Sequence, residues 1–145
     1  MNIQIDLKPE SFYDVYSWNI LPKIKKIDLL LKLSLSTIKV ADAANVLEIS
    51  EDEVKSIMAC ENIKRVGKRN FFRIMAVGSS MICRYFSREL EIGSPLTYSS
   101  NDIAYIYGLC ADDVENAFLL LGIKEATALT LPHVFVRIPA IHRLQ

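Results

Sequence analysis

The stretch between residues 37 and 60 constrains the fold most strongly, because two short patterns with helical spacing meet there across only three residues. In each pattern the apolar residues recur at three- and four-residue intervals, which places them on one face of a helix. Ser50 precedes the second pattern, and with Glu53 it matches a capping box, a signal for the start of a helix. We therefore predict a helix-turn-helix, two short helices that cross steeply at close range. The residues expected to face inward are Ala43, Ala44, Leu47, Ile49, Val54, Ile57 and Met58.

A weak internal repeat appears when the chain is shifted by sixty residues. Ala44 falls on Ala104 and Val54 on Val114, the small residue and the first inward residue of the second helix. The shift predicts a second helix-turn-helix over residues 98–121, with Ala104, Leu109, Val114 and Phe118 inward. The other identical pairs are Thr37 with Thr97, Asp42 with Asp102, Asp52 with Asp112, Ile63 with Ile123, and Lys64 with Lys124.

The composition supports a mainly α fold built on two tri-helical units. Of the 145 residues 51% are hydrophobic, which is ample for a core, and only five Gly and five Pro interrupt the helical patterns. We predict an N-terminal helical arm at residues 1–21, a winged helix-turn-helix unit at 22–92, and a second, degenerate unit at 93–145.

The wing of the first unit is predicted from residues 62–74, where two short apolar runs flank Gly67-Lys68-Arg69. A glycine with positive φ in that turn would give a short β-hairpin. The alternative is that Asn70 caps a helix of one to two turns that runs to Gly78. A further helix is expected from Met81 to about Glu91, capped by Ser79 or Ser80 and ended by Gly93.

The charge of the chain is zero overall but uneven along the sequence. Residues 54–88 carry eight Lys or Arg against one acid, whereas residues 1–53 and 89–145 are both net acidic. Such a distribution argues against a protein that coats nucleic acid with its whole surface, and it suits one that holds DNA along one face.

The run from Val40 to Ile74 resembles the excisionase and MerR-type helix-turn-helix families. The matching residues are Ala44, Leu47, Ile49, Ser50, Val54, Val66, Gly67, Lys68 and Arg69. In those families the second helix enters the major groove and the wing touches phosphate. The resemblance implies that Lys55 and Ser56 face the groove while Lys68 and Arg69 meet the backbone. The neighbouring bases complete the candidate DNA-binding set, which is Lys55, Ser56, Lys64, Arg65, Lys68, Arg69 and Arg73.

One feature departs from that pattern, because the second helix opens with Glu51, Asp52 and Glu53. Acids suit the N-terminus of a helix but repel the DNA backbone. The chain from Gly78 onward also resembles uncharacterised, clostridial-type helix-turn-helix proteins of anaerobic Gram-positive bacteria, a resemblance that implies no function. The function expected is a DNA-binding protein, a transcriptional regulator or an accessory factor on double-stranded DNA.

Catalysis is not expected, and neither is a cofactor or a metal. The two histidines, His133 and His142, have no partner at a triad or metal spacing, and there is no Gly-rich phosphate loop. Cys60, Cys83 and Cys110 are too far apart in sequence for a metal knuckle and are expected to be reduced. Without a signal peptide or a membrane span, the protein is predicted to be cytoplasmic.

The aromatic segment of residues 12–21 leaves two alternatives open. It is expected to pack on the body of the protein, and the other interpretation is a homodimer or protein-partner contact. The rival for the whole chain is a non-enzymatic protein–protein interaction module built on a helix-turn-helix scaffold. The acidic second unit favours that rival, and the basic segment favours DNA.

Overall fold

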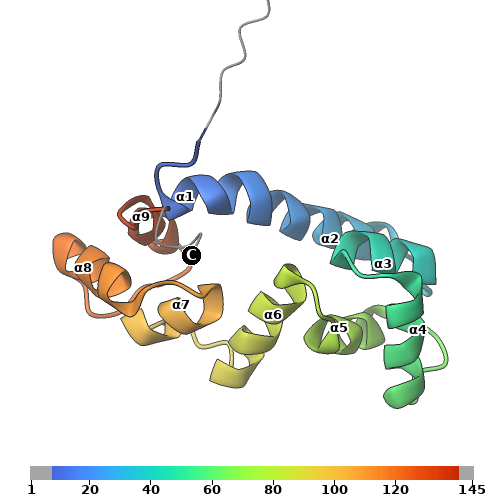
Figure 1. The fold of residues 1–145 in the computed structure, drawn as a ribbon. Helices are drawn as coiled ribbons and strands as arrows, with labels where there is room; N and C mark the ends of the chain where they lie inside the picture. The colour runs from blue at the N-terminus through green and yellow to red at the C-terminus, as the bar shows by residue number, and fades with distance from the viewer. Residues whose placement is uncertain (1–7, 141–145) are drawn as a thin grey trace, which may run out of the picture. The chain divides into compact units, whose positions relative to one another are not determined.

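The fold is mainly helical, as predicted, in a computed structural model that describes residues 8–140 (Figure 1). No extended strand forms among these residues, and only the isolated bridges Ser11–Pro139 and Tyr98–Ala126 occur. The helices are α1 (Phe12–Val15), a π-helical turn η1 (Tyr16–Ile20), α2 (Leu21–Leu33), α3 (Val40–Leu47), α4 (Glu51–Cys60), α5 (Lys68–Val77), α6 (Met81–Ile92), α7 (Ser100–Tyr107), α8 (Ala111–Leu121) and α9 (Leu131–Val136).

The chain divides into two compact units, which we name by their place in the sequence. The central unit is Asn19–Pro95 and contains α2 to α6. The terminal unit joins Met1–Trp18 to Leu96–Gln145, and so pairs α1 with α7, α8 and α9. The aromatic segment near the N-terminus thus groups with the C-terminal third of the chain.

The sixty-residue shift reappears in the helix bounds. Helices α3 and α4 begin at Val40 and Glu51, and α7 and α8 begin at Ser100 and Ala111 (green and orange in Figure 1). Each pair is joined by three residues, the first of which is left-handed: Glu48 at φ 58° and Gly108 at φ 65°. The helical pairs predicted for residues 38–60 and 98–121 are therefore present.

Backbone hydrogen bonds repeat with the same shift. The amide of Ile49 donates to the Ala44 carbonyl at 3.1 Å, and that of Leu109 donates to Ala104 at 2.9 Å. These bonds close the C-terminus of the first helix in each pair, as expected where a left-handed residue ends a helix. Beyond the pair, Ile38 donates to Val66 and Tyr98 donates to Ala126, both at 2.8 Å. The two copies therefore share more backbone geometry than the seven sequence identities indicate.

The predicted inward residues form the cores, except for the two turn residues and Met58. Leu47, Val54 and Val114 are fully buried, and Ala44, Ile57, Ala104 and Phe118 are buried as well. The turn residues Ile49 and Leu109 are only half-buried, and so is Met58. Burial of one such aliphatic side chain stabilises a fold by roughly 1.5–3 kcal/mol.

The predicted β-hairpin wing is wrong. Gly67 has φ −90° and ψ −179°, an extended backbone rather than the positive φ of a hairpin turn, and α5 begins at the next residue. The apolar residues explain the difference, since the buried side chains Phe71, Ile74 and Met75 follow helical spacing. The helical alternative is closer, but Asn70 lies inside the helix, and its side-chain nitrogen Nδ2 donates to the Arg65 carbonyl at 2.9 Å.

The turn between α5 and α6 is packed without spare room. Ser80 is the N-cap of α6 and its hydroxyl accepts the Cys83 amide at 3.3 Å, and Gly93 ends the helix, as predicted. A Cβ placed on Gly78 would lie 2.5 Å from the Sγ of Cys83, a buried side chain. Only glycine therefore fits at residue 78 without displacing the thiol.

The aromatic residues of α1 and the π-turn pack within the terminal unit. Phe12 is fully buried and meets the ring of Phe135 edge-on, with centroids 4.8 Å apart. Tyr16 and Tyr107 complete the cluster at centroid distances of 5.1 Å from Phe135. These residues contact their own chain, while Trp18 leaves 47% of its surface exposed.

Candidate nucleic-acid interface

Helix α4 presents the residues predicted to face the groove. The Ser50 hydroxyl accepts the Glu53 amide at 3.0 Å and so begins the helix. Val54 and Ile57 are buried, which fixes the rotation of α4 about its axis. Lys55 and Ser56 follow on the opposite face, and both are exposed.

Only one of the two hydrogen bonds of the capping box predicted at Ser50 forms, the one from the Glu53 amide to the Ser50 hydroxyl. The carboxylate of Glu53 accepts instead from the amide and the hydroxyl of Ser79, each at 2.8 Å. This bidentate contact ties the start of α4 to the turn between α5 and α6. It also satisfies one of the three acids at the start of α4, whereas Glu51 and Asp52 stay exposed.

The segment between α4 and α5 exposes two basic residues, which lie between the two buried residues Ile63 and Val66. Ile63 and Val66 are buried, and their backbones are fixed by the bonds from Ile63 to Met58 and from Ile38 to Val66, both 2.8 Å. Lys64 and Arg65 lie between these two residues and are exposed. The short segment therefore takes the place next to α4 that the sequence assigned to a hairpin strand.

Lys68 and Arg69 form the start of α5 and are exposed. Each basic residue at a helix N-terminus opposes the helix dipole, at a cost of roughly 0.3–1 kcal/mol at low ionic strength. The first turn of α5 contains no acid. Ion pairs such as Lys23–Glu48, Lys32–Asp28 and Arg73–Glu61 form within residues 8–140, and none there includes Lys68 or Arg69.

Arg73 is placed differently from the other candidate residues. Its guanidinium lies 3.1 Å from the Glu61 carboxylate and donates to the Glu61 carbonyl at 3.0 Å. These contacts link the C-terminal end of α4 to α5. The six remaining candidates, Lys55, Ser56, Lys64, Arg65, Lys68 and Arg69, are exposed on α4, the connecting segment and the start of α5.

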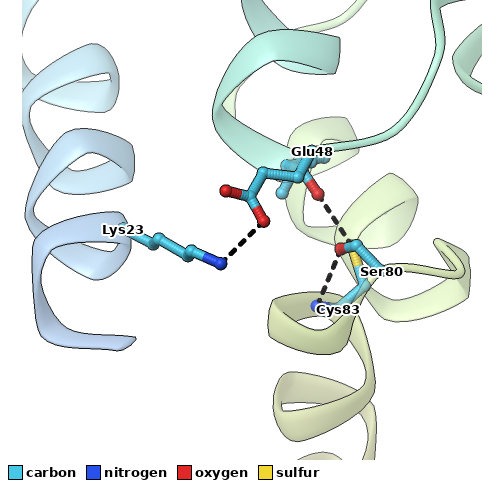
Figure 2. A network of polar contacts seen from close by, with 5 residues as sticks. Lys23, Glu48, Ser80 and Cys83 are labelled. Atoms are coloured by element: carbon cyan, nitrogen blue, oxygen red, sulfur yellow. Dashed lines mark hydrogen bonds and ion pairs between the residues drawn. The ribbon is translucent and has the colours of Figure 1, made fainter. Parts of the chain in front are cut away.

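The same unit contains the polar network drawn in Figure 2. The Lys23 ammonium reaches the Glu48 carboxylate at 2.8 Å and so links α2 to the turn after α3. Burial raises the pKa of the Cys83 thiol, against a smaller opposing effect of hydrogen bonding with Ser80, whose hydroxyl also accepts the Cys83 backbone amide. A protonated thiol packed in the interior is a poor nucleophile. The network therefore has the character of a structural contact.

The structure offers no grouping typical of metal chemistry among residues 8–140, where no three His, Cys, Asp or Glu side chains could share an ion. His133 is exposed on α9, and His142 lies outside the described residues. None of the helices between residues 8 and 140 is long and apolar enough to cross a membrane. Comparison with protein-family models, with curated proteins and with solved structures found no match to this chain.

Two surfaces were missed by the sequence interpretation. One is an apolar groove between α2, α5 and α6, and the other is the outward face of α8, where Leu119 and Leu120 are exposed. In the sequence, Phe72 indicates the groove, because this large apolar residue falls outside the helix face formed by the buried residues Phe71, Ile74 and Met75. The leucine run at the end of α8 gave a signal for the second, because one helix face cannot bury all three leucines.

Proposed function

We propose that the central unit binds double-stranded DNA, with α3 and α4 acting as a helix-turn-helix and α4 lying against the major groove. The chain would then serve as a transcriptional regulator or an accessory DNA-binding factor. The observation that carries the proposal is that the bases on α4, the connecting segment and the start of α5 are all exposed. Bases without acidic partners are the usual means of holding phosphate.

The roles of the residues follow from their positions. Lys68 and Arg69 would hold phosphate from a helix start rather than from a wing, and the amide groups of that first turn add positive potential there. Lys55 and Ser56 would meet base edges. Arg73, which is bound to Glu61, would fix the angle between α4 and α5 rather than touch DNA.

Glu51 and Asp52 set a limit on this proposal. Their exposed carboxylates stand at the N-terminal end of α4, the end that most helix-turn-helix proteins direct at bases. Repulsion from phosphate there favours modest affinity and weak sequence preference. Most of the binding free energy would therefore come from the bases beyond α4.

The test is a salt titration of binding to a labelled duplex and to a scrambled duplex, followed by fluorescence anisotropy. The double variant Lys68→Ala/Arg69→Ala should weaken binding to both duplexes about equally. The slope of log affinity against log salt should fall by about two, close to one unit for each phosphate interaction that the variant removes. Lys55→Ala should instead change the preference between the duplexes.

The matched control is Lys25→Ala/Lys26→Ala, which removes the same charge from an exposed part of α2 in the same unit. This control should keep the slope of the unaltered protein. Equal losses in the two double variants would mean that net charge alone drives binding. Failure of the unaltered protein to bind either duplex at low salt would reject the proposal in favour of the interaction module.

A further inference from the structure

An apolar groove of about 230 Å³ lies within the central unit, between α2, α5 and α6. Ile24, Ile27 and Leu31 form its α2 wall, and Phe72, Met75 and Phe86 line it from α5 and α6. Ile24 and Phe72 leave 39% and 41% of their surfaces exposed. Asp28 also lines the groove, and its carboxylate is paired with Lys32 at 2.7 Å. The groove is thus open to an apolar side chain.

A basic residue, Lys68, precedes the groove residue Phe72 on α5. Lys68 lies one helical turn before Phe72, so the two side chains share a face of α5. Lys68 is exposed, and the ion pairs of residues 8–140 do not include it. An occupant of the groove would therefore gain from a carboxylate placed one turn before its apolar residue.

Helix α8 of the terminal unit carries that arrangement. Leu119 and Leu120 leave 72% and 74% of their surfaces exposed, large fractions for leucines on a helix. Glu115, also exposed, lies one turn before Leu119 on the same face, and Asp112 is exposed near the start of the helix. The spacing from Glu115 to Leu119 is the same as that from Lys68 to Phe72.

We propose that the groove of one molecule receives the Leu119–Leu120 face of α8 from a second molecule of the same chain. With α8 parallel to α5, Leu119 enters beside Phe72 and Glu115 pairs with Lys68. The charge distribution supports this arrangement, since residues 54–88 are strongly basic and residues 89–145 are net acidic. A groove on one unit and a helix on the other make a head-to-tail contact, which closes into a ring or extends as a chain.

The test is sedimentation velocity of the full chain without DNA, from micromolar to submillimolar concentration. The unaltered protein should associate as its concentration rises. Glu115→Lys and Lys68→Glu should each weaken association about tenfold, equivalent to about 1.4 kcal/mol. The double variant Glu115→Lys/Lys68→Glu restores the opposite charges and should recover most of the affinity. Leu119→Ser should weaken association as well, with an unchanged helical signal in circular dichroism because the side chain is exposed.

The matched control is Glu10→Lys, the same charge change at another exposed position of the terminal unit, and it should associate like the unaltered protein. A protein that stays monomeric at every concentration would overturn the proposal and leave the groove to a different partner. Association that the double variant fails to recover would equally overturn the pairing of Glu115 with Lys68. Because no DNA is present, these results do not depend on the outcome of the duplex titration.

Discussion

Gly78→Ala is the substitution whose effect the structure predicts most sharply. The added methyl carbon would lie 2.5 Å from the Sγ and 3.2 Å from the Cβ of Cys83. The backbone gives no reason for a penalty, because φ −57° and ψ 155° at residue 78 suit any residue. Cys83 is fully buried and cannot swing its thiol into solvent. The whole cost therefore comes from overpacking, and we expect about 1–3 kcal/mol.

A double-mutant cycle isolates that contact. Cys83→Ala alone removes one buried sulfur and should cost about 0.5–1.5 kcal/mol, as for loss of a single buried methyl group. In the double variant the new methyl occupies the space that the sulfur leaves, so the two costs should not add. We expect the double variant to be more stable than the sum of the single effects by about 1–2 kcal/mol. Recovery stays incomplete because the Cβ of Cys83 remains close at 3.2 Å.

Urea unfolding followed by far-ultraviolet circular dichroism would measure the four free energies of unfolding. Cys60→Ala is the control, since Cys60 is an exposed cysteine on α4, and it should show no coupling to Gly78→Ala. Additive costs within about 0.3 kcal/mol would refute the close packing of the α5–α6 turn. A stable Gly78→Ala single variant would refute it directly.

Two further predictions concern the turn after α3 and the buried thiol. Glu48→Gly should change stability by less than about 1 kcal/mol, because relief of the left-handed backbone offsets loss of the exposed Lys23 ion pair. At the equivalent position after α7, Gly108→Ala should destabilise the protein by about 1 kcal/mol, because alanine is strained in the left-handed region. Urea unfolding of both variants would measure this contrast. Equal changes in the two free energies of unfolding would contradict it. Burial raises the pKa of Cys83 above its value in the unfolded chain. The contribution of the neutral thiol to the free energy of unfolding is therefore full at neutral pH, and it is lost as pH rises through the folded pKa. Stability should therefore decline in the alkaline range, and Cys83→Ala, measured at the same pH values, should decline less.

The helices that the sequence predicted correctly carry their signals within a few residues. Ser50 and Ser80 begin α4 and α6 where a capping serine was expected, and Gly93 ends α6. A hairpin was preferred to the helical alternative for α5 because Gly67-Lys68-Arg69 has the composition of a hairpin turn, and because bases at a helix start oppose the usual preference. The spacing of its buried residues was the stronger signal.

The parts that failed depend on contacts between distant residues. Glu53 has the residue type and the position of a capping-box residue, but its carboxylate is bound by Ser79, twenty-six residues later. Arg73 is a residue type that commonly binds phosphate, but its guanidinium charge is paired with the Glu61 carboxylate. The outward position of Lys55 and Ser56 was implied by the family resemblance, and both residues are exposed. The apolar groove is formed by residues of α2, α5 and α6 together, so no local sequence pattern could predict it.

The repeated turn has a consequence for how freely this chain can change. A left-handed residue and one backbone hydrogen bond hold each helix pair, so the outward side chains contribute little to the bend. Glu48 and Gly108 meet the same requirement with very different side chains. Lys55 corresponds to Glu115 under the shift, and the sign of the outward charge is reversed while the scaffold is kept. The outer faces of α4 and α8 are thus nearly independent of the architecture, and mutation can give them opposite chemistries without putting folding at risk.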